Sequence, residues 1–129
     1  MFYSFPQGFL WGAAASAPQT EGAADVDGKA PTVWDFWYEQ EPERFHNRVG
    51  PAVTSDFYHR FREDIANMQA IRLNSYRTSL SWARLMPDSV QVNEKAVNFY
   101  RSVIDELLDK DVEPIINLYH FDMPLHLQK

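Results

Sequence analysis

Polar side chains in this sequence gather just after or within its apolar, strand-like segments. Gln19 and Glu21 follow the first such segment, Arg77 lies within the second, and His120 and Asp122 follow the third. In parallel α/β folds the functional groups collect at the carboxyl ends of the strands. Each residue alone has an ordinary explanation, such as a solvated loop position or a structural histidine. Their coincidence at one edge of a predicted sheet is what indicates a site.

Amide, carboxylate and imidazole groups beside aromatic rings suit a sugar. Each sugar hydroxyl both donates and accepts a hydrogen bond, and aromatic faces cover the apolar side of the ring. The sequence contains no glycine-rich phosphate loop, and its four histidines show no metal-ligand spacing. We therefore expect a polyol ligand and no cofactor or metal. A buried arginine needs an anionic partner, and no nearby acidic residue suits Arg77, so we expect that partner to come from elsewhere in the fold.

The segments that must position these residues alternate between strand and helix. The predicted strands span residues 9–16, 75–82 and 114–119, and the predicted helices span 55–71 and 93–110, with a third beginning at 125. This alternation favours βαβ units and a parallel sheet, whose strands are buried on both faces.

Helical periodicity supports both helices. Apolar residues recur on one face of each: Phe57, Phe61, Ile65 and Met68 in the first, and Val97, Tyr100, Ile104 and Leu107 in the second. Residues 17–54 are predicted to hold no long element, because glycines and prolines interrupt them. Loops of that length in a compact domain are usually functional.

Composition excludes several classes of protein. The 129 residues carry a net charge of −6, which argues against nucleic acid and anionic membranes as partners. The sequence has no cysteine and no apolar run near the ~20 residues of a membrane span. Its first residues lack the basic and apolar regions of a signal peptide. We expect one cytoplasmic domain.

Five segments resemble, in order and at family spacing, glycoside hydrolase family 1, which contains the β-glucosidases and 6-phospho-β-glucosidases. They are FPQGFLWGAAASAPQTEGA (residues 5–23), PTVWDFW (31–37), SDFYHRFREDIANM (55–68), NSYRTSLSWARLMP (74–87) and VNEKAVNFYRSVIDELLDKDVEPIINLYHFDMP (92–124). The resemblance implies a retaining hydrolase of β-glycosides with a (β/α)₈ barrel. Residues 1–129 would be the amino-terminal part of that single barrel domain, comprising its first three βα units.

The resemblance also assigns roles to residues. Gln19 and His120 match the family's side chains that hydrogen-bond sugar hydroxyls. Phe121 stands where the family often has tryptophan, so the aromatic surface for substrate is kept but an indole N–H is lost. Arg77 matches the arginine that lies beside the nucleophile carboxylate and keeps it ionised, which would supply the missing anionic partner. The segments YRTSLSW and YHFDMP are more similar to the 6-phospho-β-glucosidases than to the other β-glucosidases of the family. A phosphorylated β-glucoside is therefore an expected substrate.

The family's two catalytic glutamates are not in this sequence. They belong to Asn-Glu-Pro and Thr-Glu-Asn-Gly motifs, whereas Glu94 is followed by Lys95, and Glu113 precedes a strand. No catalytic residue is therefore assigned, and these residues alone are predicted to be inactive. One alternative is a non-catalytic, sugar-binding or oligomeric remnant of the barrel, and another is an α/β domain whose aromatic residues are only core. Unpaired strand edges and uncovered apolar faces further predict that the isolated chain self-associates.

Overall fold

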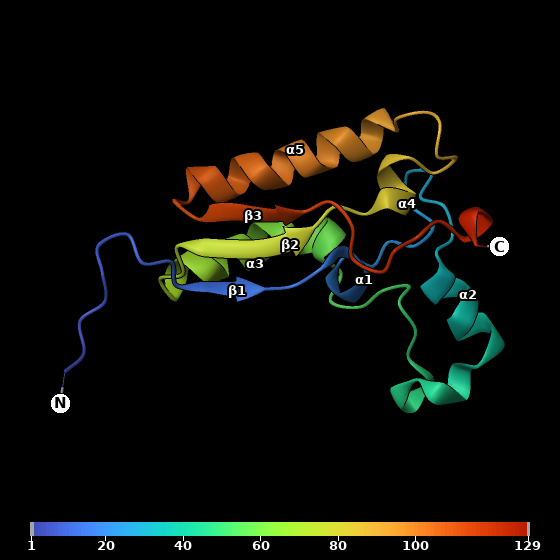
Figure 1. Cartoon of the computed structure of the whole chain (residues 1–129), viewed down its shortest axis with the longest axis horizontal. Helices are drawn as coiled ribbons and strands as arrows, with labels where there is room; N and C mark the ends of the chain where they lie inside the picture. Colours follow the sequence, from blue (N-terminus) through green and yellow to red (C-terminus); the bar gives the residue numbers. More distant parts are fainter. Residues whose placement is uncertain (1, 129) are drawn as a thin grey trace.

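The computed structural model describes residues 2–128 and contains three strands in one parallel sheet (Figure 1). The strands are β1 (Gly12–Ala14), β2 (Ser75–Ser79) and β3 (Glu113–Asn117), in the order β1-β2-β3. Gly12 pairs with Ser75, and Ser75 with Glu113, so the three strands begin at the same level. Their carboxyl ends consequently form one edge, as the sequence predicted.

Two long helices follow the first two strands, α3 (Phe57–Ala70) and α5 (Glu94–Asp109). The shorter helices are α1 (Ala17–Thr20), α2 (Val33–Gln40), α4 (Trp82–Leu85) and the 3₁₀ turns Pro42–Arg44, His46–Arg48 and Leu125–Leu127. Among the helices of the described residues, none has the length and apolar character that crossing a membrane requires.

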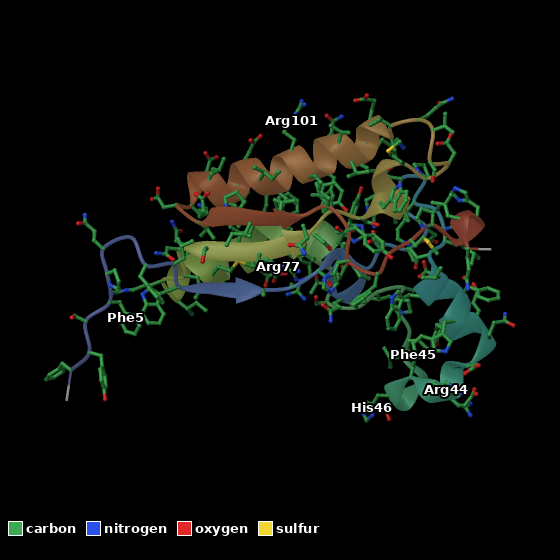
Figure 2. The ribbon with its side chains drawn as sticks, viewed as in Figure 1. Phe5, Arg44, Phe45, His46, Arg77 and Arg101 are labelled. Atoms are coloured by element: carbon green, nitrogen blue, oxygen red, sulfur yellow. The ribbon has the colours of Figure 1, made fainter. Side chains whose placement is uncertain are left out.

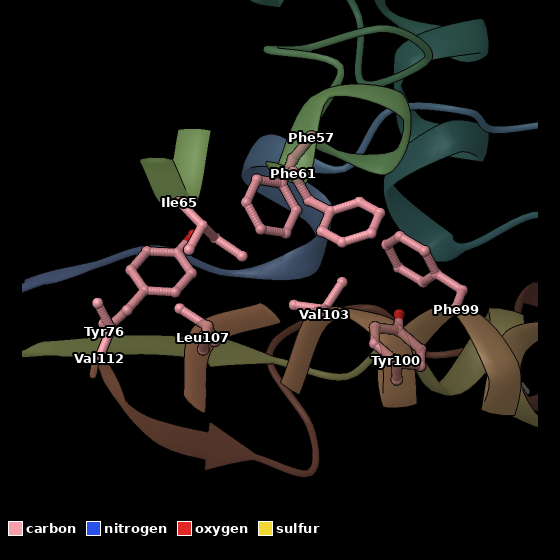
Figure 3. Packing of buried hydrophobic residues seen from close by; sticks show 9 residues of the cluster. All are labelled: Phe57, Phe61, Ile65, Tyr76, Phe99, Tyr100, Val103, Leu107 and Val112. Carbon is pink, nitrogen blue, oxygen red and sulfur yellow. The ribbon is translucent and has the colours of Figure 1, made fainter. Parts of the chain in front are cut away.

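The hydrophobic core lies between the two long helices and one face of the sheet (Figure 3). Phe57, Phe61 and Ile65 of α3 are buried as predicted, and Tyr76 of β2 packs against them. On α5 the buried face is rotated from the predicted one. Its buried members are Ala96, Phe99, Tyr100, Val103 and Leu107, whereas Val97 and Ile104 are only half-buried.

Residues 17–54 contain no element as long as α3 or α5, as predicted, but they are not without secondary structure. The segment forms α2, whose start is fixed by a capping box at Thr32. Thr32 Oγ1 accepts a hydrogen bond from Asp35 N (3.2 Å), and Thr32 N donates to Asp35 Oδ2 (2.8 Å). This reciprocal pair satisfies two amide groups that helix formation leaves unpaired, so the helix forms despite the surrounding prolines and glycines.

The strands are shorter than predicted, and β3 is not buried. Residues 9–11 precede β1 and are exposed. In β3 the side chain of Ile115 is 43% exposed, and beyond it Leu118 is 78% exposed. Each outer strand pairs on only one side within the described residues. An apolar run therefore predicted the strand, but its burial requires neighbours that residues 2–128 do not supply.

Candidate functional site

Gln19 is held at the carboxyl edge by the turn that follows β1. Ala17 N donates to Ser79 Oγ of β2 (2.8 Å), which fixes the start of α1 to the neighbouring strand. Ser16 Oγ then donates to Gln19 Oε1 (2.6 Å), so the amide oxygen is oriented by a buried hydroxyl. Gln19 itself is exposed and presents its side chain at the edge of the sheet.

Arg77 and His120 meet at the same edge. From β2 (Figure 2), Arg77 donates through Nε to Asn117 Oδ1 (3.1 Å) and through Nη1 to Ala15 O (3.0 Å). Its Nη2 lies 3.4 Å from His120 Nδ1. Because a guanidinium only donates, a hydrogen bond across this contact uses Nδ1 as the acceptor and has the ring N–H at Nε2. His120 therefore has one donor N–H to offer a ligand.

The acceptors around Arg77 are all neutral. No carboxylate of the described residues lies within 4.0 Å of its guanidinium. The residue is only half-buried, so its charge remains partly solvated. Residues 2–128 thus supply no anionic partner to Arg77. Because the side chain is only half-buried, its charge does not require one.

Phe121 adopts a left-handed backbone conformation, with φ +65°. The side chain is 60% exposed, and its ring centroid lies 4.7 Å from that of His120. Together with Gln19 it lines a cavity of about 460 Å³, whose other walls include Trp34 and Phe45. The structure thus brings Gln19 and Phe121 to one cavity, while Arg77 and His120 form a separate pair that does not line it.

Two aromatic residues of this cavity were not among the predicted site residues. Trp34 is the second residue of α2, and Phe45 follows the first 3₁₀ turn, near Arg44 and His46 in Figure 2. The rings of Trp37 and Phe45 are 4.9 Å apart, and that of Trp34 is 5.1 Å from Trp37. The high density of aromatic residues in 34–45 was the available signal. Because no helix or strand was predicted there, these side chains could not be placed relative to the site.

Glu21 is buried rather than presented to a ligand. Its Oε2 accepts from Arg84 Nε (3.1 Å), and its Oε1 accepts from the Tyr100 hydroxyl (2.6 Å). Burial raises the pKa of the Glu21 carboxyl, although the guanidinium of Arg84 acts in the opposite direction. Burial likewise raises the pKa of Tyr100 well above 10.0. The arginine that is buried with an anionic partner is therefore Arg84, not Arg77.

Asp122 is also internal, with 1% of its surface exposed. The two remaining candidate glutamates are away from the edge: Glu113 begins β3, and Glu94 lies in the first turn of α5. Within residues 2–128 there is no group of three or more His, Cys, Asp or Glu side chains that could hold a metal ion. The edge therefore offers an amide, an imidazole N–H, a guanidinium and an aromatic face, which together can bind a polyol.

The sequence pattern described as "Glycosyl hydrolase family 1" matches residues 1–129. A 6-phospho-beta-glucosidase, GmuD of Bacillus subtilis (strain 168), is 54% identical over 98% of this chain, which spans 28% of the relative. Beta-glucosidase 17 of Arabidopsis thaliana is 44% identical over 97% of this chain and 25% of its own length. The chain thus spans about a quarter of the curated relatives it matches.

Solved structures give the same result for the fold. The psychrophilic beta-glucosidase BglU from Micrococcus antarcticus superposes with a TM-score of 0.93 at 40% identity, covering 98% of this chain and 27% of that one. The family 1 b-glucosidase from Thermotoga maritima gives 0.91 at 38% identity, over 96% and 28%. The predicted fold, the first three βα units of a (β/α)₈ barrel, is confirmed.

Proposed function

Because the chain belongs to glycosyl hydrolase family 1, we propose that residues 1–129 are the amino-terminal part of a retaining β-glycosidase that hydrolyses the O-glycosidic bonds of β-glucosides. The observation that carries this proposal is the placement of Gln19, Arg77 and His120. These residues come from three separate βα units, and all three lie at the carboxyl edge of the sheet. In a single barrel domain that edge is where a substrate binds.

The geometry supports a division of roles at this edge. Gln19 and the Nε2–H of His120 would hydrogen-bond sugar hydroxyls, and the exposed ring of Phe121 would cover the apolar face of the sugar. Arg77, whose partners are all neutral, would stand beside a carboxylate nucleophile and lower its pKa by favouring the charged form.

Retaining hydrolysis needs two carboxyl groups about 5–5.5 Å apart, one acting as acid and base and one as nucleophile. Neither Glu94 nor Glu113 can serve, because one starts a helix and the other lies at the amino end of β3. We therefore propose that both catalytic carboxylates lie outside residues 1–129, and we expect these residues alone to have no hydrolytic activity.

The substrate we propose is a β-glucoside phosphorylated on its sugar. Two Bacillus subtilis relatives support this, the 6-phospho-beta-glucosidase GmuD at 54% identity and the aryl-phospho-beta-D-glucosidase BglC at 46%. The plant beta-glucosidase 17 is 44% identical, so the preference rests mainly on GmuD. A cytoplasmic location accompanies this proposal, since sugars phosphorylated on import are found inside the cell.

The test compares 4-nitrophenyl β-D-glucopyranoside with its 6-phosphate as substrates of the complete protein that contains residues 1–129. We expect hydrolysis of both, with a larger kcat/KM for the phosphate, and no turnover by residues 1–129 alone. A complete protein that hydrolyses neither refutes the glycosidase. Calorimetric binding of glucose 6-phosphate that is lost in His120→Ala would then favour the non-catalytic, sugar-binding alternative.

A further inference from the structure

The carboxylate of Asp122 joins the loops that follow two neighbouring strands. Its Oδ2 accepts from Trp82 N (2.6 Å), at the start of α4 after β2. Its Oδ1 accepts from His120 N (3.2 Å), in the loop after β3. Both donors are backbone groups, so this carboxylate fixes main-chain positions rather than another side chain.

The side chain is not available to a ligand. Asp122 is 1% exposed, and no Lys, Arg or His nitrogen of residues 2–128 lies within 4.0 Å of its carboxylate. An isolated buried carboxylate is costly unless it is hydrogen-bonded. The two amide donors supply that compensation, and the bonds are of the charge-assisted kind. The carboxylate thus requires these donors, and each donor is held where the carboxylate can reach it.

Phe121 lies between His120 and Asp122, the two residues that the shorter-range hydrogen bond joins, and its φ is +65°. A residue with a Cβ adopts that conformation at a cost, and the structure around it must compensate. The bond from His120 N to the side chain two residues later closes the turn over Phe121. The same bond fixes the backbone of His120, from which the ring extends so that its Nδ1 lies 3.4 Å from Arg77 Nη2.

We propose that Asp122 is a positioning residue for sugar recognition, which presents His120 to Arg77 and Phe121 to the cavity without touching the ligand itself. This inference rests on the proposed function for the identity of the ligand. Its structural half, the fixing of the 120–122 turn, stands apart from any ligand.

The experiment measures two properties of the complete protein and of its Asp122→Ala, Asp122→Asn and Ser81→Ala variants. Calorimetry gives the Kd for glucose 6-phosphate, well below each variant's melting temperature. Amide hydrogen exchange of the peptide 118–124 gives the order of the turn. Ser81 is the matched control, because it is buried in the same region but its Oγ has no hydrogen-bond partner among residues 2–128.

Asp122→Ala should weaken binding by roughly tenfold or more and accelerate exchange in 118–124, because both charge-assisted bonds are lost. Asp122→Asn should fall between Asp122→Ala and the unmodified protein in both readouts, since one amide oxygen can still accept one bond. Ser81→Ala should change neither. Should Asp122→Ala fail to fold, Asp122→Asn carries the test.

A purely structural role for Asp122 would lower the melting temperature but leave Kd and the exchange of 118–124 unchanged below it, and that result overturns the inference. If the unmodified protein binds neither glucose 6-phosphate nor glucose, the proposed function fails instead. The exchange of 118–124 then still decides whether Asp122 fixes the turn, so the two failures are distinguishable.

Discussion

Replacing Arg84 with methionine should destabilise the protein by about 3–5 kcal/mol, because it leaves a charged carboxylate buried without its partner. Arg84 is fully buried, and its guanidinium donates to Glu21 Oε2 at 3.1 Å. It also donates to the carbonyl oxygens of Gly22, Ala23 and Val26 at 3.1–3.2 Å. Methionine fills similar space but donates to none of them. The loss is a large part of the roughly 5–15 kcal/mol that stabilises a typical domain.

The penalty should depend on pH in a known direction. Burial raises the pKa of Glu21 above its ordinary 4.5, and Arg84 is the largest influence that lowers it. Removing Arg84 raises this pKa further. A carboxyl whose pKa is higher in the folded than in the unfolded state contributes its stability below the unfolded pKa and loses it as pH rises through the folded pKa. The Arg84→Met penalty should therefore be smaller near about pH 5 than near about pH 8.

Urea unfolding of the complete protein at both pH values measures this effect. The matched control is Arg101→Met, the same substitution at an exposed position of α5 (Figure 2), which should cost no more than about 0.5 kcal/mol. Adding Glu21→Gln to Arg84→Met should recover stability, because the second change removes the stranded charge. A penalty equal to that of Arg101→Met, or one that does not change with pH, would refute the reasoning.

Three further predictions concern the fold. Gly22→Ala should lower the free energy of unfolding, measured in urea, by more than Gly28→Ala does. Both glycines have positive φ (+64° and +77°), which costs a residue with a Cβ about 1–2 kcal/mol, but of the two only at Gly22 would the Cβ also meet a backbone carbonyl. Equal losses for the two variants would contradict this. Tyr58→Phe should raise the pKa of the Asp27 carboxyl, measured by NMR titration, because the hydrogen bond from the Tyr58 hydroxyl is the largest influence that lowers this pKa. The stability that the Asp27 carboxylate contributes is lost as pH falls through its folded-state pKa. A pKa that does not change in Tyr58→Phe would count against the hydrogen bond. Residues 1–129 alone should sediment as species larger than a monomer, and Ile115→Lys at the β3 edge should reduce them; a monodisperse monomer with a sharp, cooperative melt would exclude self-association.

Much of the fold was predicted from hydrophobic periodicity, and the errors of that prediction have local physical causes. The apolar stripe of α3 was predicted correctly because Phe57, Phe61 and Ile65 pack on one core. The buried face of α5 was rotated because Phe99 and Val103, rather than Val97 and Ile104, face that core. Strand lengths were overestimated because an apolar run continues past the residues that pair, as in the residues before Gly12.

The helix α2 was missed for a different reason. Glycines and prolines around it favoured a loop, but the motif Thr-Val-Trp-Asp at residues 32–35 carries a threonine and an acidic residue at capping-box spacing. That signal is local and was present in the sequence. Reading it would have placed Trp34 on a helix and drawn attention to the aromatic wall of the cavity.

Which polar residues bind a ligand could not be decided from their positions, because a supporting network and a binding surface both follow the strands. Their difference lies in how their hydrogen-bonding groups are used. Arg84 and Asp122 direct their groups to internal partners and are at most 1% exposed. At the proposed sugar site, His120 Nε2 has no hydrogen-bond partner among residues 2–128, and Phe121 is 60% exposed. A group that supports the fold must satisfy itself internally, whereas one that binds a sugar must leave a donor, an acceptor or a ring face available. The sequence lists both kinds as polar or aromatic residues after a strand, and only the geometry separates them.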